Sequence, residues 1–181
     1  MKELIEEKLL LYKVQTEKDA EAFALLYDRY VDQVYRFVFF KLSHKQEAED
    51  VTGDVFLKCW QFLTGEKGKT ARNFRSLLYT IARNCVIDVY RSRSKQKEQS
   101  LADIDLDDGG VQKYILESKG DNEKIFVAMK KMKQEYQEVV LFKYIEDFSI
   151  GEIAAMTGKS IVSVRVTLHR ALKKLRELLD E

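Results

Sequence analysis

The segment from residue 161 to about 179 places cations and apolar side chains together on one helical face. At about 100° per residue, that face carries Val162, Arg165, Val166, His169, Arg170 and Lys173. Cations so placed can bind DNA phosphates, and arginine can pair with guanine in the major groove. The two valines would meet thymine methyl groups there. The face therefore predicts contact with duplex DNA, and a solvated basic surface is the alternative.

This face is preceded in the sequence by a helix-start signal, a glycine and a second helix-start signal. Ser149 and Glu152 have the spacing of a capping box, so a helix is expected to begin directly after the serine. Gly158 suits the left-handed residue that ends such a helix, and Ser160 can cap the next one. A short helix, a glycine turn and a longer basic helix form a helix-turn-helix.

Aromatic and basic residues alternate between residues 72 and 97. Tyr79 and Tyr90 stand among arginines in this segment, which include Arg72, Arg75, Arg83 and Arg91. Stacking faces beside cations suit single-stranded DNA, whose bases are unstacked and whose backbone is charged. The glycine-bearing loop at 64–70 could fold around a base turned out of the duplex. The alternative is that aromatic residues at helical spacing are core.

Acidic residues crowd the segment before that loop: Glu47, Glu49, Asp50 and Asp54. An acidic face does not bind DNA, but it suits a basic surface on a protein partner. Asp50 and Asp54 share one helical face, whereas Glu49 and Asp50 point apart. A solvated face is again the alternative.

Apolar residues recur at three- and four-residue steps along most of the chain, which predicts amphipathic helices. The expected helices are 2–14, 18–42, about 44–62, 74–93, one around residue 125, 134–146, one from residue 150, and one to about residue 179. Thr16, the pair Ser43 and Gln46, and Asn73 are the expected helix-start signals in the first half. Gly53 interrupts a helix, and close helix packing is one explanation.

The composition changes between residues 98 and 122, which are acidic, contain glycine and have no sustained period. We therefore expect an all-α protein of two small helical domains, 1–97 and 123–181, joined by a flexible acidic linker at 98–122. The absence of proline among the 181 residues agrees with helices, and the 45% apolar share is enough for a core.

Several classes of function are disfavoured. His44 and His169 lack metal-ligand spacing with other residues, and Cys59 and Cys85 lie in apolar segments where they are expected to be buried. No phosphate-cradling glycine motif is present. We therefore expect no metal, no cofactor, no small-molecule substrate and no catalysis. The net charge of +1 predicts weak DNA binding by the chain alone. No signal peptide or membrane span is evident, so we expect a cytoplasmic protein.

Over residues 18–179 the chain resembles the extracytoplasmic-function sigma factors of the sigma-70 family. AEDVTGDVFL at 48–57 is similar to the family's AEDLVQEVFL, and FRSLLYTIARN at 74–84 is similar to FRSWLYRIARN, with Asp88 following in place. In the last two helices Glu152-Ile153-Ala154, Gly158, Val164 and Leu168-His169-Arg170-Ala171 match the motifs EIA, G, V and LHRA. Glycine at 53 stands where the family usually has glutamine.

The resemblance implies a division of labour. The first domain would bind the clamp helices of the largest subunit of RNA polymerase through Glu49, Asp50, Asp54 and Phe56. It would melt and read the promoter's minus-ten element through Arg72, Asn73, Arg75, Arg83, Asn84, Asp88 and Arg91. The second domain would meet the flap of the second-largest subunit and read the minus-thirty-five element through the basic face. An anti-sigma factor is the expected inhibitory partner.

Other readings remain open at this point. A conventional helix-turn-helix regulator would bind duplex operators without polymerase, usually as a dimer. A DNA-processing enzyme would need Glu49, Asp50 and Asp54 to form a metal site, which their helical spacing does not favour. A helical adaptor would leave the basic face unexplained.

Overall fold

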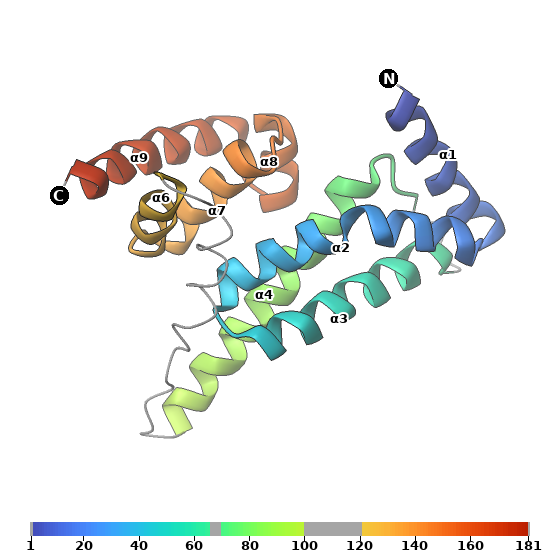
Figure 1. Ribbon diagram of the computed structural model, residues 1–181, viewed down its shortest axis with the longest axis horizontal. Coiled ribbons are helices and arrows are strands. Elements are labelled where there is room, and N and C mark those ends of the chain that lie inside the picture. Colours follow the sequence, from blue (N-terminus) through green and yellow to red (C-terminus); the bar gives the residue numbers. More distant parts are fainter. Residues whose placement is uncertain (1, 66–69, 100–120, 181) are drawn as a thin grey trace. The chain divides into compact units, whose positions relative to one another are not determined.

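The computed structural model describes residues 2–65, 70–99 and 121–180, and every element in these ranges is a helix (Figure 1). The chain divides into two compact units, one up to Gly110 and the other from Val111. Most of the predicted linker at 98–122 lies outside the described residues. Its two ends are helical, because α4 continues to Gln99 and α6 begins at Asp121. None of the described helices is long and apolar enough to cross a membrane.

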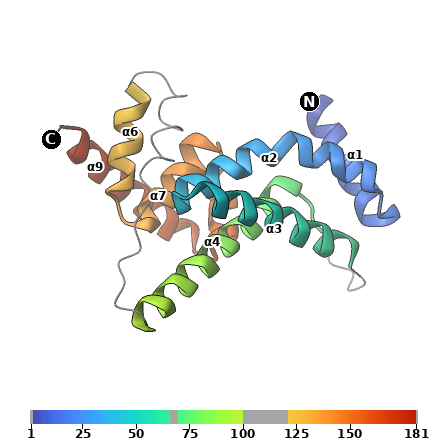
Figure 2. The same ribbon diagram turned by 60° about the horizontal axis from the view of Figure 1, so that its bottom comes forward.

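The first unit is built around α2, which packs against three other helices. Its helices are α1 (Lys2–Glu17), α2 (Ala20–Leu42), α3 (Lys45–Thr64) and α4 (Phe74–Gln99). Figures 1 and 2 show α1 folding back on the start of α2, with α3 running beside α2 and α4 crossing it at an angle. Aromatic rings fill the space between the helices: the ring of Phe23 lies 5.1 Å from that of Trp60 and 6.3 Å from that of Phe74.

Two of the predicted helix starts in this unit are wrong. Because α1 continues to Glu17, the Thr16 hydroxyl lies inside it and donates to the Tyr12 carbonyl at 2.8 Å. The cap of α2 is Asp19, whose Oδ1 accepts from the amides of Glu21 and Ala22 at 2.9 and 3.0 Å. Aspartate is among the strongest N-cap residues, and it is the first extended residue before this helix.

The start of α3 also differs from the prediction. Ser43 has a φ of 57° and is the left-handed residue that ends α2, so it cannot also begin the next helix. His44 then takes the extended N-cap conformation, and its Nδ1 accepts from the Glu47 amide at 3.2 Å. The prediction that Asn73 caps α4 is confirmed, since Asn73 Oδ1 accepts from the Ser76 amide at 2.9 Å.

The second unit contains the helix-turn-helix. Its elements are α6 (Asp121–Lys130), α7 (Gln134–Val140), the π-helix η1 (Leu141–Ile145), α8 (Ile150–Thr157) and α9 (Ile161–Asp180). The predicted helix 134–146 is therefore α-helical only to Val140, after which the hydrogen bonds widen to a π-helix. Phe142 and Phe148 are almost fully buried and lie edge to face, 5.8 Å apart.

The turn of the helix-turn-helix is built as predicted. The Ser149 hydroxyl accepts from the Glu152 amide at 3.2 Å, and the Glu152 carboxylate accepts from the Ser149 amide at 2.9 Å, which completes the capping box. Gly158 ends α8 with a φ of 68°, a conformation that side chains rarely adopt. Ser160 Oγ accepts from the Ser163 amide at 3.1 Å and begins α9.

Candidate functional site

The outer face of α9 is the first candidate surface. All six residues predicted on it are exposed, including Val162 at 68% and Val166 at 43%. On the opposite side Val164 and Ala171 are fully buried, and Leu168, Leu172 and Leu175 are half-buried. Thr167 is also buried. The face therefore has the exposure that contact with DNA needs.

An acid on α7 fixes α9 and the turn before it. Glu135 Oε1 is paired with the Lys159 ammonium and lies 3.5 Å from the Thr167 hydroxyl. The hydrogen bond from Lys159 lowers the pKa of Glu135. One carboxylate thus holds the turn and the first half of α9 on the core of the unit.

The residues predicted to bind unpaired DNA do not form one face of α4. Asn84, Asp88 and Arg91 follow one another at helical spacing and are exposed, with Asp88 and Arg91 3.5 Å apart in an ion pair. Arg75 lies on the other side of the helix, and it and Arg83 are half-buried. Arg72 and Asn73 are exposed just before α4 begins. The exposed residues predicted to bind unpaired DNA are therefore divided between the start of α4 and its outer face.

The two tyrosines of the alternating segment both contact α2. Tyr79 is fully buried, its ring packs edge-on against Phe37 at 5.5 Å, and the Arg75 guanidinium lies 5.8 Å above it. The Tyr90 hydroxyl donates to the Lys41 carbonyl at 2.7 Å. Both serve the packing of α4 on α2, which is the core alternative that the sequence left open.

Glu49, Asp50 and Asp54 are all exposed on α3 and are together called its acidic face, although only Asp50 and Asp54 point the same way. Phe56 was predicted on this face as well, but the structure buries it, with its side chain only 3% exposed. Its ring lies 4.6 Å from that of Tyr27, inside the aromatic core. It is two positions beyond Asp54, on the inner side of the helix, so it supports the face from beneath.

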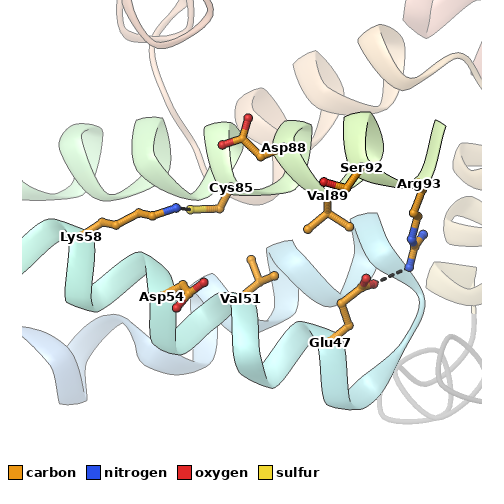
Figure 3. Close-up of a pocket in the computed structure, with 9 residues that line it drawn as sticks. All are labelled: Glu47, Val51, Asp54, Lys58, Cys85, Asp88, Val89, Ser92 and Arg93. Atoms are coloured by element: carbon orange, nitrogen blue, oxygen red, sulfur yellow. Dashed lines mark hydrogen bonds and ion pairs between the residues drawn. The ribbon is translucent and has the colours of Figure 1, made fainter. Parts of the chain in front are cut away.

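A groove of about 290 Å³ separates the facing sides of α3 and α4 (Figure 3). Asp54 and Asp88 both line it, so the predicted polymerase face and the predicted DNA face meet there. The two helices are tied across the groove at both ends: Arg93 is paired with Glu47, and Lys58 Nζ lies 3.4 Å from Cys85 Sγ. The sequence did not predict these links, because they join residues 27 and 46 positions apart.

Both cysteines are buried as predicted. Burial raises the pKa of the Cys59 thiol to about 12. Burial also raises the pKa of the Cys85 thiol, although the hydrogen bond from Lys58 opposes this. Among the described residues, no three histidine, cysteine or acidic side chains are grouped closely enough to hold a metal ion.

The structural neighbours share this fold. CnrH, solved in complex with the cytosolic domain of CnrY, superposes with a TM-score of 0.70 and 22% identity, covering 97% of both chains. The sigma factor RpoE of Bartonella quintana, solved with the anti-sigma factor NepR, superposes with the same score and identity, covering 89% of this chain and 98% of its own.

Sequence comparison gives the family. The model of sigma-70 region 2 matches residues 26–96 and that of sigma-70 region 4 matches residues 122–175, which together exceed half of the chain. The sigma factor BldN of Streptomyces coelicolor is 31% identical over 90% of this chain, which spans 62% of BldN. The sigma factor SigX of Bacillus subtilis is 28% identical over 88% of this chain and 84% of its own length. Both relatives are extracytoplasmic-function factors, and this chain belongs to the extracytoplasmic-function sigma factors of the sigma-70 family.

Proposed function

We propose that this chain directs core RNA polymerase to a specific set of promoters and assists promoter melting. The observation that carries the proposal is the pairing of two exposed surfaces of opposite character in one chain, the acidic face of α3 and the basic face of α9. A sigma factor is not an enzyme, and RNA synthesis belongs to the polymerase.

The basic face of α9 is proposed to read the minus-thirty-five element as duplex DNA. Arg165, Arg170 and Lys173 are exposed where phosphates and guanine edges would lie, and His169 lies between them. Val162 and Val166 are exposed apolar side chains within the same face. Contact with thymine methyl groups would remove these valines from water, whereas a surface that faces only solvent would leave them exposed.

The first unit is proposed to bind polymerase through Glu49, Asp50 and Asp54 on α3. A basic helical surface, such as the clamp helices of the largest subunit, complements these carboxylates. Asn84, Asp88 and Arg91 on the outer face of α4, with Arg72 and Asn73 before it, are proposed to meet the minus-ten element. The groove between α3 and α4 brings these two contacts within one unit.

The low net charge makes each DNA contact weak by itself. When the chain is bound to polymerase, each of its two DNA contacts raises the effective concentration of the other. Selectivity for promoters therefore arises in the complex. We place this complex in the cytoplasm, with the flap of the second-largest subunit beside the second unit.

An anti-sigma factor is the proposed inhibitor of the free chain. Two structural neighbours were solved with such partners or with a partner's cytosolic domain. The exposed acidic face of α3 would be available to a competing protein before polymerase binds it. A pull-down from unstressed cells that recovers no inhibitor would count against this part of the proposal.

Run-off transcription tests the function. Purified core polymerase is given genomic promoter fragments with and without the chain, and discrete transcripts that require the chain are expected. Arg165→Ala/Arg170→Ala should abolish them. Lys124→Ala/Lys131→Ala, which removes two exposed cations elsewhere in the second unit, should leave them. Tight binding of the chain alone to duplex DNA, without a dependent transcript, would instead identify a conventional regulator.

A further inference from the structure

Helix α1 is tied to the segment that leads into α4. Both polar atoms of the Gln15 side-chain amide bind the backbone of one residue across 56 positions of sequence. The Ala71 amide donates to Gln15 Oε1 at 2.7 Å, and Gln15 Nε2 donates to the Ala71 carbonyl at 3.3 Å. The side chain therefore holds the peptide groups on both sides of the Ala71 Cα, as a neighbouring strand would.

A second connection reaches the other end of the same segment. The Tyr30 hydroxyl on α2 donates to the Glu7 carboxylate on α1. Burial, together with this bond, raises the pKa of Tyr30. The ring of Tyr30 lies 5.6 Å from that of Phe74, the fully buried first residue of α4. Helix α1 thus braces the segment at residue 71 directly and at residue 74 through Tyr30.

Helix α1 is itself anchored by buried apolar side chains. Leu10, Leu11 and Val14 are buried within the first unit, and Val14 is buried completely. Gln15 follows Val14 at the edge of that buried face and is itself half-buried. Removing its amide would therefore leave the packing of α1 in place and release only the backbone of residue 71.

Arg72 lies between two fixed neighbours. Ala71 is held by Gln15, and Asn73 is held as the N-cap of α4. The Arg72 side chain is exposed. An arginine that meets unpaired DNA gains affinity when its backbone is already in place, because less conformational entropy is lost on binding.

We propose that Gln15 is a positioning residue for promoter reading, which holds residue 71 so that Arg72 is presented to the unpaired strand of the minus-ten element. The inference rests on the proposed function, since it assumes that Arg72 contacts that strand. It gives α1 a role inside the first unit.

The test compares three variants of the full chain on core polymerase. Gln15→Leu removes both hydrogen bonds at similar volume, and Gln15→Glu keeps the acceptor and loses the donor. Thr16→Val is the matched control, because the Thr16 hydroxyl binds only within its own helix in the contacts described. The readouts are the affinity for polymerase, permanganate reactivity of the melted strand, and the effect of each base substitution in the minus-ten element.

Gln15→Leu should reduce melted complex about tenfold, the equivalent of one to two hydrogen bonds, and should weaken the preference for particular bases. Gln15→Glu should fall between wild type and Gln15→Leu, while Thr16→Val should match wild type. Affinity for polymerase should stay within about twofold. Unchanged melting and base preference in Gln15→Leu would overturn the inference, and so would a parallel loss of polymerase affinity.

Arg72→Ala separates this inference from the proposed function. It should weaken melting and base preference, and Gln15→Leu should add little in its background. A loss in Arg72→Ala without one in Gln15→Leu would overturn only the positioning role. No loss in Arg72→Ala would overturn the DNA contact itself and the role of Gln15 with it.

Discussion

The Glu135 carboxylate of α7 is paired with the Lys159 ammonium in the turn between α8 and α9. The same oxygen lies 3.5 Å from the Thr167 hydroxyl, so a single acid on α7 contacts both the turn and α9. The helix proposed to face DNA is therefore oriented partly by charge, and its orientation should respond to acid.

The first prediction concerns pH. Lys159 lowers the pKa of Glu135 below its ordinary value of 4.5, so the folded state favours the ionised acid. The stabilisation is present above pH 4.5 and is lost as the pH falls through the lowered pKa in the folded state. The Glu135 side chain is 49% exposed, so the effect should stay below about 1 kcal/mol.

Urea unfolding followed by the NMR signal of His169 would measure this effect in the second unit. The free energy of unfolding of wild type should exceed that of Glu135→Gln near neutral pH, and the two should converge in acid. A difference that is constant across this range would show that the charge of Glu135 contributes nothing.

The second prediction concerns thymine methyl groups. Uracil in place of thymine in the minus-thirty-five element should weaken binding of the polymerase complex by about 1 kcal/mol at each contacted base, the value of one buried methyl group. Val162→Ala/Val166→Ala should no longer distinguish the two bases. Val127→Ala, an exposed valine on α6, is the control and should still distinguish them. Equal discrimination by all three proteins would rule out the valine contact.

The third prediction concerns the acidic face of α3. Asp50→Asn/Asp54→Asn should lower the affinity for core polymerase about tenfold and make it less sensitive to salt, because an attractive charge pair is lost. Asp32→Asn removes an exposed charge from α2 and should have little effect. Fluorescence titration with core polymerase would measure both. If Asp32→Asn lowers affinity equally, general charge rather than this face is responsible.

The fourth prediction separates Phe56 from that face. Phe56→Ala should destabilise the first unit by about 3–5 kcal/mol, because it leaves a cavity beside Tyr27. Phe56→Leu should retain more of the stability and bind polymerase as tightly as wild type at a temperature where it is folded. Loss of polymerase affinity in a folded Phe56→Leu would mean that the ring makes a direct contact.

The fifth prediction concerns Gly53. A Cβ atom added there would meet nothing within 4 Å, so close helix packing does not explain this glycine. Gly53→Ala should therefore stabilise the chain by about 0.5–1 kcal/mol through helix propensity. Thermal unfolding followed by circular dichroism would measure it. A destabilised Gly53→Ala would mean that the backbone here needs a freedom that alanine lacks.

The sequence predicted the helix-turn-helix most accurately, because its signals are local. The capping box at Ser149 and Glu152, the left-handed Gly158 and the cap at Ser160 each depend on a few neighbouring residues. The caps of α2 and α3 were predicted too early in the sequence, at Thr16 instead of Asp19 and at Ser43 instead of His44. Which residue begins each helix depends on where the preceding helix ends, and tertiary packing decides that.

Which residues of α4 are exposed was harder to predict. Tyr79 and Arg83 stand four positions apart in a segment that alternates aromatic and basic residues, yet Tyr79 is fully buried. The reason is Phe37 on α2, which supplies the partner ring. The Gln15 amide bound to Ala71 has no local signature either, because its partner is a backbone 56 residues away.

The links between α3 and α4 have a consequence for where transcription starts. Two contacts, Glu47 with Arg93 and Lys58 with Cys85, join α3 and α4 into one rigid body. Helix α3 is proposed to bind polymerase, and α4 is proposed to bind the opened strand. The distance from the opened bases to the polymerase active centre is then set by the folding of one unit. A longer or shorter connection between the units should change the tolerated gap between the two promoter elements and leave the first transcribed nucleotide where it was.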